Sequence, residues 1–123
     1  MKENKLTSEE RALRTRELLD DINMLYDELY NLADHHLKTL PLYFDAIGRG
    51  TKRFEVRWND RGFKEGDVVS LDEWDAQKHC FTGNSFLVLV EEVFPLDDAA
   101  RALEGYVAFT FRILTAERER EAQ

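Results

Sequence analysis

One short alternating segment constrains the fold of this chain more than any other part of it. Between Arg53 and Asn59, apolar and polar residues alternate, and consecutive side chains of a β-strand point to opposite faces of the sheet. The apolar set is predicted to face a hydrophobic core: Phe54, Val56 and Trp58. The polar set is predicted to line a surface or a cleft: Arg53, Glu55, Arg57 and Asn59. Fixed charges of both signs on one strand face suit an anionic or base-like ligand.

The size and composition of the chain fit one globular domain. Its 123 residues are 43% hydrophobic and 34% charged, which argues against wholesale disorder and leaves room for one modest core. The longest apolar run, Phe86–Val90, is far too short to cross a bilayer, and the polar N-terminus does not resemble a secretory signal. We therefore expect a cytoplasmic protein with no membrane partner.

The cysteine and histidine content predicts no disulfide, metal site or cofactor. Cys80 is the single cysteine of the sequence, so it has no internal partner. His35–His36 and His79–Cys80 are adjacent pairs, and adjacent side chains on a strand point apart. That arrangement lacks the spacing of metal ligands.

The charges are distributed unevenly along the chain. The formal net charge is −8, yet the segment from Arg49 to Lys64 holds six basic and two acidic residues. An acidic chain does not bind nucleic acid indiscriminately, because phosphate affinity is mostly electrostatic. The local basic patch favours a small or short anionic ligand over long duplex DNA. From charge alone, solvated charges on a hairpin are the alternative.

The first 33 residues predict one amphipathic helix. Thr7 is expected to cap it, with Glu10 completing a capping box. Apolar residues then recur in a heptad seam: Leu18, Ile22, Leu25, Leu29 and Leu32. Such a seam must be buried, so we expect it to pack against its own domain or to form a homodimer. The chain is thus predicted to be a monomer or a dimer, and a dimerisation module is one hypothesis for its function.

The rest of the pattern predicts an α+β domain. Strands are expected over residues 35–38, 53–58, 67–74, 86–94 and 105–113, and helices over residues 41–47 and 96–103. The loop 59–66 and the turn 82–84 carry turn-forming residues. The last strand alternates, with one apolar face formed by Val107, Phe109, Phe111 and Ile113. The short connection near Gly83 favours antiparallel pairing and barrel-like closure, with parallel βαβ units as the open alternative.

These patterns predict three segments. Residues 1–33 form a helical extension, residues 34–113 form the domain, and residues 114–123 form a charged tail that is expected to be frayed or helical.

The order and spacing of many residues in the domain resemble one family. The matching residues are His35-His36-Leu37-Lys38, Pro41, Tyr43-Phe44, Ile47, Gly50-Thr51-Lys52, Phe54-Glu55, Arg57 and Asn59-Asp60-Arg61-Gly62-Phe63, followed by Gly66-Asp67, Leu71, Glu73-Trp74-Asp75, Phe81-Thr82-Gly83 and Glu104-Gly105-Tyr106. Over residues 34–113 the chain resembles the ASCH superfamily and, within it, the DUF3850 group. The N-terminal helix lies outside this resemblance.

The resemblance implies a PUA-like fold, a small and partly open β-barrel of about five or six strands with flanking helices. It also implies RNA or nucleotide binding in a cleft beside the barrel. Some ASCH proteins are amidohydrolases that deacylate acylated cytidine with a Gly-x-Lys-x-x-Thr-x-Arg motif, in which the lysine is catalytic and the threonine is the nucleophile. Lys52 and Arg57 match this motif, whereas Glu55 stands at the threonine position. The resemblance therefore favours a binding domain, with the amidohydrolase as the alternative.

Individual roles follow from the resemblance and the residue chemistry. Lys52, Arg57 and Arg61 are expected to meet phosphates or carbonyls, and Glu55 an amino or imino edge of a base. The full candidate binding set is His35, Lys38, Lys52, Glu55, Arg57, Asn59, Arg61 and Phe63. For an enzyme, Lys52 and Glu55 are the candidate catalytic residues. A hydrogen-bonded structural role is the alternative for His35, and a same-face ion pair is the alternative for Glu55 and Arg57.

Overall fold

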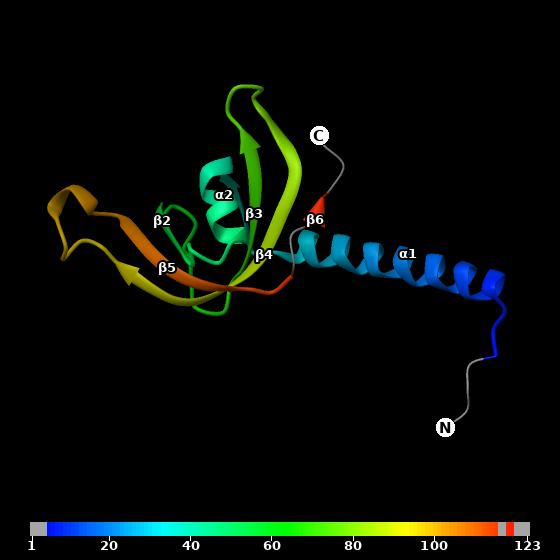
Figure 1. Ribbon diagram of the computed structural model, residues 1–123. Helices are drawn as coiled ribbons and strands as arrows, with labels where there is room; N and C mark the ends of the chain where they lie inside the picture. The colour runs from blue at the N-terminus through cyan, green and yellow to red at the C-terminus, as the bar shows by residue number, and fades with distance from the viewer. Residues whose placement is uncertain (1–4, 116–117, 120–123) are drawn as a thin grey trace. The chain divides into compact units, whose positions relative to one another are not determined.

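The computed structural model describes residues 5–115 and 118–119 (Figure 1), and the chain divides into two units, Met1–Leu32 and Ala33–Gln123. The first unit contains helix α1, Ser8–Leu32. The Thr7 hydroxyl oxygen accepts a hydrogen bond from the Glu10 amide at 3.1 Å, which confirms the predicted N-cap. A single helix cannot bury its own apolar stripe, and within this unit the heptad residues are exposed. Burial of the seam stays a prediction. In the part of the chain that the structure describes, no helix is long and apolar enough to cross a membrane.

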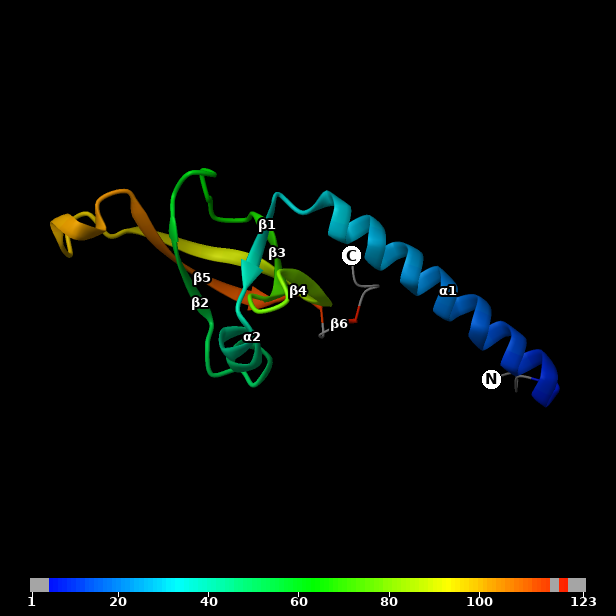
Figure 2. The same cartoon turned by 90° about the horizontal axis from the view of Figure 1, so that it is seen from above.

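The second unit is a curled sheet with one helix. Its elements are β1 (His35–Thr39), α2 (Pro41–Gly48), β2 (Phe54–Trp58), β3 (Val68–Asp75), β4 (Cys80–Pro95), the short 3-10 helix η1 (Arg101–Leu103), β5 (Tyr106–Ile113) and β6 (Arg118–Glu119). The strand order is β1-β3-β4-β5-β2, and β6 pairs with β4. Viewed from above, the sheet curls into a partly open barrel, as expected (Figure 2). The strands at the two ends of the order, β1 and β2, bound the open side.

The core lies on the inner face of this sheet. Its most deeply buried side chains come from the three central strands: Val69, Leu71, Val88, Val90, Phe109 and Phe111. Phe44 and Ile47 of α2 close one side of it. The predicted inner face of β5 is confirmed, with Ile113 packed partly buried at its end.

Four details differ from the sequence-based expectation. The β3–β4 connection turns at residues 76–79, where His79 has a φ of 51°, and Gly83 lies inside β4 instead of in a turn. Strands β1 and β3 pair in parallel, where antiparallel pairing was favoured and parallel pairing was the open alternative, while the other pairs are antiparallel. The helix expected over residues 96–103 is reduced to η1. In the tail, residues 118–119 form β6, and the rest of the tail beyond Thr115 lies outside the described residues.

The prediction of a turn at residues 82–84 was wrong for a physical reason. Thr82 and Asn84 both donate side-chain hydrogen bonds to Glu73 Oε1 on β3, at 2.7 and 3.1 Å. These cross-strand bonds satisfy the turn-forming side chains within the sheet, so β4 continues through Gly83. A register shift between Val90 and Glu92 later bends this long strand.

The predicted orientation of β2 was also wrong. Phe54, Val56 and Trp58 are 48%, 46% and 54% exposed, whereas Glu55 is only 5% exposed. The strand alternates as expected, but its polar face is the inner one. The buried side chains of β3, β4 and β5 already fill the core, so the inner face of β2 meets the open side of the barrel, where charged groups pair with one another.

This orientation can be tested with two valines on neighbouring strands. Val56→Ala removes a half-exposed side chain and should lower the free energy of unfolding by less than about 0.5 kcal/mol. Val107→Ala, at a position 4% exposed, should lower it by about 2 kcal/mol because it leaves a cavity. Urea unfolding of both variants measures the two losses. Equal losses would contradict the orientation described above.

Candidate functional site

A tight turn after α2 places Lys52 at the start of β2. The Ala46 carbonyl oxygen accepts hydrogen bonds from the backbone amides of Thr51 and Lys52, at 3.0 and 3.2 Å. Gly50 adopts a φ of 77°, a left-handed conformation that favours glycine. The chain therefore leaves the helix just before β2, and the Lys52 side chain reaches forward along the strand to Phe54 and Glu55.

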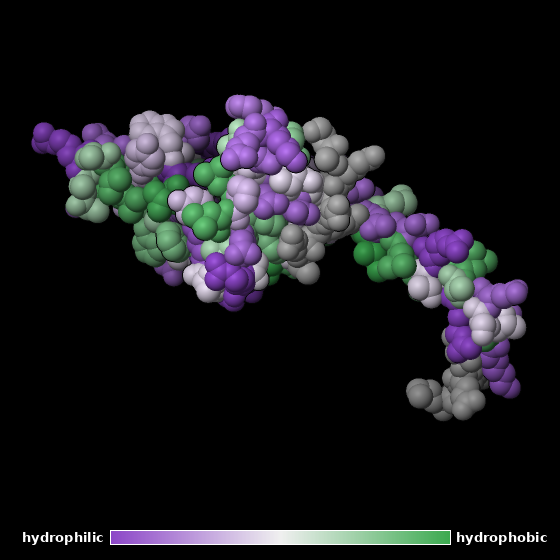
Figure 3. All heavy atoms as spheres, turned by 45° about the horizontal axis from the view of Figure 1, so that its top comes forward, coloured by the Kyte–Doolittle hydropathy of each residue, from purple (hydrophilic) through white to green (hydrophobic). Residues whose placement is uncertain are grey.

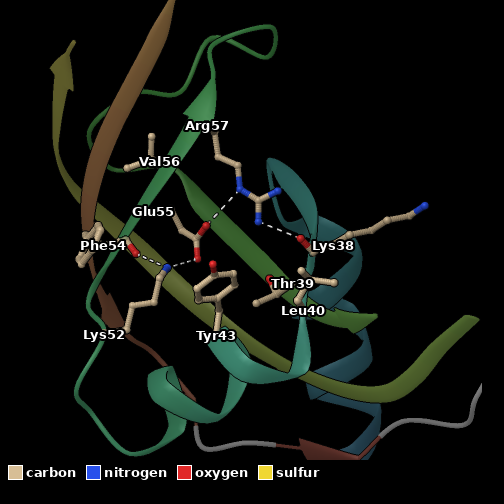
Figure 4. Close-up of a pocket in the computed structure, with 9 residues that line it drawn as sticks. All are labelled: Lys38, Thr39, Leu40, Tyr43, Lys52, Phe54, Glu55, Val56 and Arg57. Carbon is tan, nitrogen blue, oxygen red and sulfur yellow. Dashed lines mark hydrogen bonds and ion pairs between the residues drawn. The ribbon is translucent and has the colours of Figure 1, made fainter. Parts of the chain in front are cut away.

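The centre of the site is the carboxylate of Glu55 (Figure 4). The Lys52 ammonium donates to Glu55 Oε1 at 2.8 Å, and Arg57 Nε donates to Glu55 Oε2 at 3.1 Å. The Glu55 side chain is 7% exposed. Burial of an unpaired carboxylate costs several kcal/mol, and here each oxygen has its own cationic partner. The predicted alternative, an ion pair on one strand face, is therefore present, and it includes Lys52.

Arginine side chains link the two edges of the open sheet. Arg57 Nη2 on β2 donates to the Lys38 carbonyl oxygen on β1 at 2.8 Å. Arg61 Nη1, just beyond β2, donates to the His36 carbonyl oxygen at 2.7 Å. The gap between β1 and β2 is thus bridged by side chains, which leaves room for a cleft beside them.

The cleft has a volume of about 450 Å³, within the usual range for small-molecule sites. Its lining residues come from the end of β1, the start of α2 and β2: Lys38, Thr39, Leu40, Tyr43, Lys52, Phe54, Glu55, Val56 and Arg57. The Lys52 ammonium lies 5.5 Å from the ring centroid of Tyr43 and 5.0 Å from that of Phe54. Two aromatic rings therefore accompany the charged groups.

The hydroxyl of Thr39 distinguishes this cleft from an ordinary ion-pair cluster. Thr39 is 2% exposed, and its Oγ1 atom is buried without a hydrogen-bond partner among the described residues. A buried polar group without a partner is costly. A ligand in the cleft could supply the missing hydrogen bond.

The charged groups also keep unused hydrogen-bonding capacity. Lys52 has three donors, of which one points to Glu55 and another to the Phe54 carbonyl oxygen at 2.6 Å. Arg57 has five donors, and two hydrogen bonds from it are described above. The Glu55 oxygens can each accept a second hydrogen bond. The cleft can therefore present donors and acceptors at the same time.

Three of the eight predicted binding residues meet in this cleft through their side chains: Lys52, Glu55 and Arg57. Lys38 lines it, but its side chain points away (Figure 4), and its ammonium lies 3.9 Å from the centroid of the Trp74 ring. Only the Lys38 carbonyl joins the network. The polar contact of Arg61 is likewise with the β1 backbone, and Arg61 does not line the cleft.

The other predicted residues stabilise the loop after β2. His35 Nε2 lies 2.8 Å from Asp67 Oδ2, and its ring packs against Phe63. Phe63 is 5% exposed and packs on Phe109, so its ring is buried and is not available to bind a ligand. Asn59 Oδ1 accepts a hydrogen bond from the Phe63 amide at 3.0 Å. The structural alternative for His35 agrees with this arrangement.

Sequence reasoning missed five lining residues: Thr39, Leu40, Tyr43, Phe54 and Val56. The first three flank Pro41, at the point where β1 ends and α2 begins. A strand followed by a proline-initiated helix indicates an abrupt change of direction, which is a usual place for a pocket wall. Phe54 and Val56 were missed because β2 was assigned the opposite orientation.

A second hollow, of about 530 Å³, carries less functional signal. Its polar lining residues are Asp45, Arg49, Glu73 and Asn84. Asp45 and Arg49 form an exposed ion pair at 2.8 Å, and Glu73 accepts the cross-strand hydrogen bonds described above. Among residues 5–115 and 118–119, no group of three or more His, Cys, Asp or Glu side chains is arranged to hold a metal ion.

The chain belongs to the DUF3850 family, a domain of unknown function, whose family model matches residues 34–111. It is also similar to an uncharacterized 12.9 kDa protein in the GpA 3′ region of Escherichia phage P2. The two are 37% identical over 73 residues, which cover 59% of this chain and 62% of the phage protein. The matched part thus spans less than two thirds of the length of that relative.

The central ion pair can be tested by removing its charge. Glu55→Gln leaves two cations facing a neutral amide and should lower the free energy of unfolding by about 2 kcal/mol or more. Asp45→Asn breaks an ion pair whose side chains are 58% and 69% exposed, and the loss should be under about 1 kcal/mol. Urea unfolding at neutral pH compares them. A cost for Glu55→Gln no larger than that for Asp45→Asn would refute the central role of this carboxylate.

Proposed function

We propose that this cleft binds RNA or a nucleotide-type ligand, and that residues 34–113 form a PUA-like domain of the ASCH superfamily. The observation that carries the proposal is the buried Glu55 carboxylate, which Lys52 and Arg57 hold inside a cleft with an unpartnered Thr39 hydroxyl. The curled, partly open sheet and the DUF3850 match over residues 34–111 support the fold assignment. The net charge of −8 makes a local site, not a broad basic surface, the place for an anionic ligand.

A nucleobase matches the chemistry of the cleft. Its edge carries donors and acceptors in one plane, and its faces stack on aromatic side chains. Glu55 would accept from an amino or imino group, and Thr39 would complete its hydrogen bonding on the same edge. Lys52 and Arg57 would use their remaining donors on carbonyl or phosphate oxygens. Tyr43 and Phe54 would supply the flanking rings.

A binding function fits the residues better than the amidohydrolase alternative. The acyl-transfer motif needs a hydroxyl nucleophile at the position where this chain has Glu55. Both oxygens of Glu55 already accept hydrogen bonds from cations, so the carboxylate is held within an ion-pair network. The close contact between Lys52 and Glu55 is the observation that favours the enzymatic alternative.

Binding can be tested by chemical-shift titration of isotope-labelled protein with nucleosides, modified cytidines, nucleotides and short single-stranded RNA. We expect perturbations on Thr39, Lys52, Glu55 and Arg57. Lys52→Ala should weaken binding by about tenfold or more, because it removes a charged hydrogen-bond donor. Lys78→Ala, in the β3–β4 turn, is the matched control and should leave the affinity unchanged. Absence of shifts in the cleft at millimolar ligand would refute the proposal.

The same samples separate binding from catalysis. An acylated cytidine incubated with the protein should be recovered unchanged, because the motif hydroxyl is absent. Release of the acyl group by the wild-type protein, abolished in Lys52→Ala while that variant stays folded, would establish the amidohydrolase instead. Release that persists in Lys52→Ala would exclude this cleft as its source.

A further inference from the structure

The outer face of β2, β5 and the end of β4 carries large apolar side chains. We call it the outer apolar face; it consists of Phe54, Val56, Trp58, Phe94 and Tyr106, all of them exposed. The strand register places them in adjacent rows, since Val56 and Phe94 both pair with Ala108, and Trp58 pairs with Tyr106. Figure 3 shows hydrophobic side chains gathered over this end of the molecule, where β4 and β5 extend.

Part of this face is fixed in place. The rings of Trp58 and Tyr106 meet edge to face, with centroids 5.3 Å apart. Gly105 lies directly under the Trp58 ring, where any Cβ atom would come within 2.5 Å of it. A rigid aromatic surface loses little conformational entropy when a partner covers it.

The face overlaps the proposed ligand site only at Phe54 and Val56. Trp58, Phe94 and Tyr106 do not line the cleft. Isolated exposed apolar residues are common on proteins, whereas a contiguous group on one sheet face marks an interaction surface.

The charges around the face indicate what kind of partner covers it. The β4–β5 segment from residue 91 to residue 112 holds five carboxylates, on Glu91, Glu92, Asp97, Asp98 and Glu104, against two guanidinium groups, on Arg101 and Arg112. On the β2 side, Lys52 and Arg57 pair with Glu55 on the opposite strand face, and Arg61 donates to the β1 backbone. Glu92 and Phe54 both pair with Thr110, so Glu92 lies in the same cross-strand row as Phe54. An acidic rim repels phosphates and attracts cationic side chains. A nucleic acid therefore does not fit this face.

A second copy of the chain fits it poorly as well. A face-to-face dimer would bring two acidic rims together. Helix α1 of another copy offers an apolar stripe, but between Leu18 and Leu32 it carries four carboxylates and no basic residue. Like charges across an interface oppose association.

We propose that the outer apolar face is a docking surface for a basic amphipathic helix of a partner protein. The apolar stripe of such a helix would cover the rows on β2, β5 and β4, as helices cover sheet faces within domains. Lysine or arginine residues flanking the stripe would meet Glu92 at one end and Asp97 and Asp98 at the other.

A Leu/Lys peptide patterned as an amphipathic helix is the probe. Titrated into labelled full-length protein, it should shift the Trp58 indole and the backbone amides of Tyr106 and Phe94. Two control peptides should cause no such shifts. One has the same composition in scrambled order, and the other is a Leu/Glu peptide of the same pattern. Phe94→Asp should weaken binding of the probe by about tenfold or more. Glu92→Lys, made separately, should also weaken this binding, and its effect should be larger at low salt than at high salt. Leu42→Asp, at an exposed apolar position on α2, is the matched control and should bind like the wild type.

Three results would overturn the proposal. The first is binding of the scrambled or the Leu/Glu peptide as tight as that of the probe. The second is a set of shifts that falls outside this face. The third is self-association of the wild-type protein in sedimentation that is lost in Phe94→Asp. The last result would assign the face to a second copy. Trp58→Ala, checked for folding by its amide spectrum, provides an independent variant, and it should weaken binding of the probe peptide.

Discussion

The paired carboxylate of Glu55 is the interaction on which the arrangement of this domain depends. A buried negative charge is tolerated only with close compensation, and the chain supplies it from two directions. Lys52 arrives from the turn after α2, and Arg57 follows two residues later on the same strand. The polar face of β2 can therefore lie on the inner side, beside the open side of the barrel, because these two cations accompany Glu55. The same orientation forms the cleft and leaves the apolar face of β2 exposed.

Local signals in the sequence predicted most of the elements. The cap at Thr7, the proline that begins α2 and the alternation of β5 each act over a few residues, and each is confirmed by the structure. The orientation of β2 depends on distant groups instead, because the carbonyl that receives Arg57 lies on β1, nineteen residues earlier. Alternation shows that a strand has two faces, but it does not show which one is buried. The same holds for Gly83, whose turn-like neighbours are satisfied by Glu73 on another strand.

The candidate site shows a similar division. Lys52, Glu55 and Arg57 lie within six residues of each other, so their proximity follows from strand geometry. Thr39 and Tyr43 line the same cleft only because the curled sheet brings β1 beside β2. No local sequence pattern predicts that approach. Conversely, Phe63 stands in a polar loop but is drawn into the core by Phe109 and His35. The polar composition of this loop therefore gives no sign that the Phe63 ring within it is buried.

The two arginine bridges have a consequence for how this protein behaves at high concentration. β1 stands at the end of the strand order, and such a strand normally exposes carbonyl oxygens to which a strand of another molecule can add. On this edge the carbonyls of His36 and Lys38 are already occupied by guanidinium groups from the same chain. The bulky, charged side chains also stand where an incoming backbone would have to approach. The feature that closes the open side of the barrel therefore also protects the domain against aggregation through that edge.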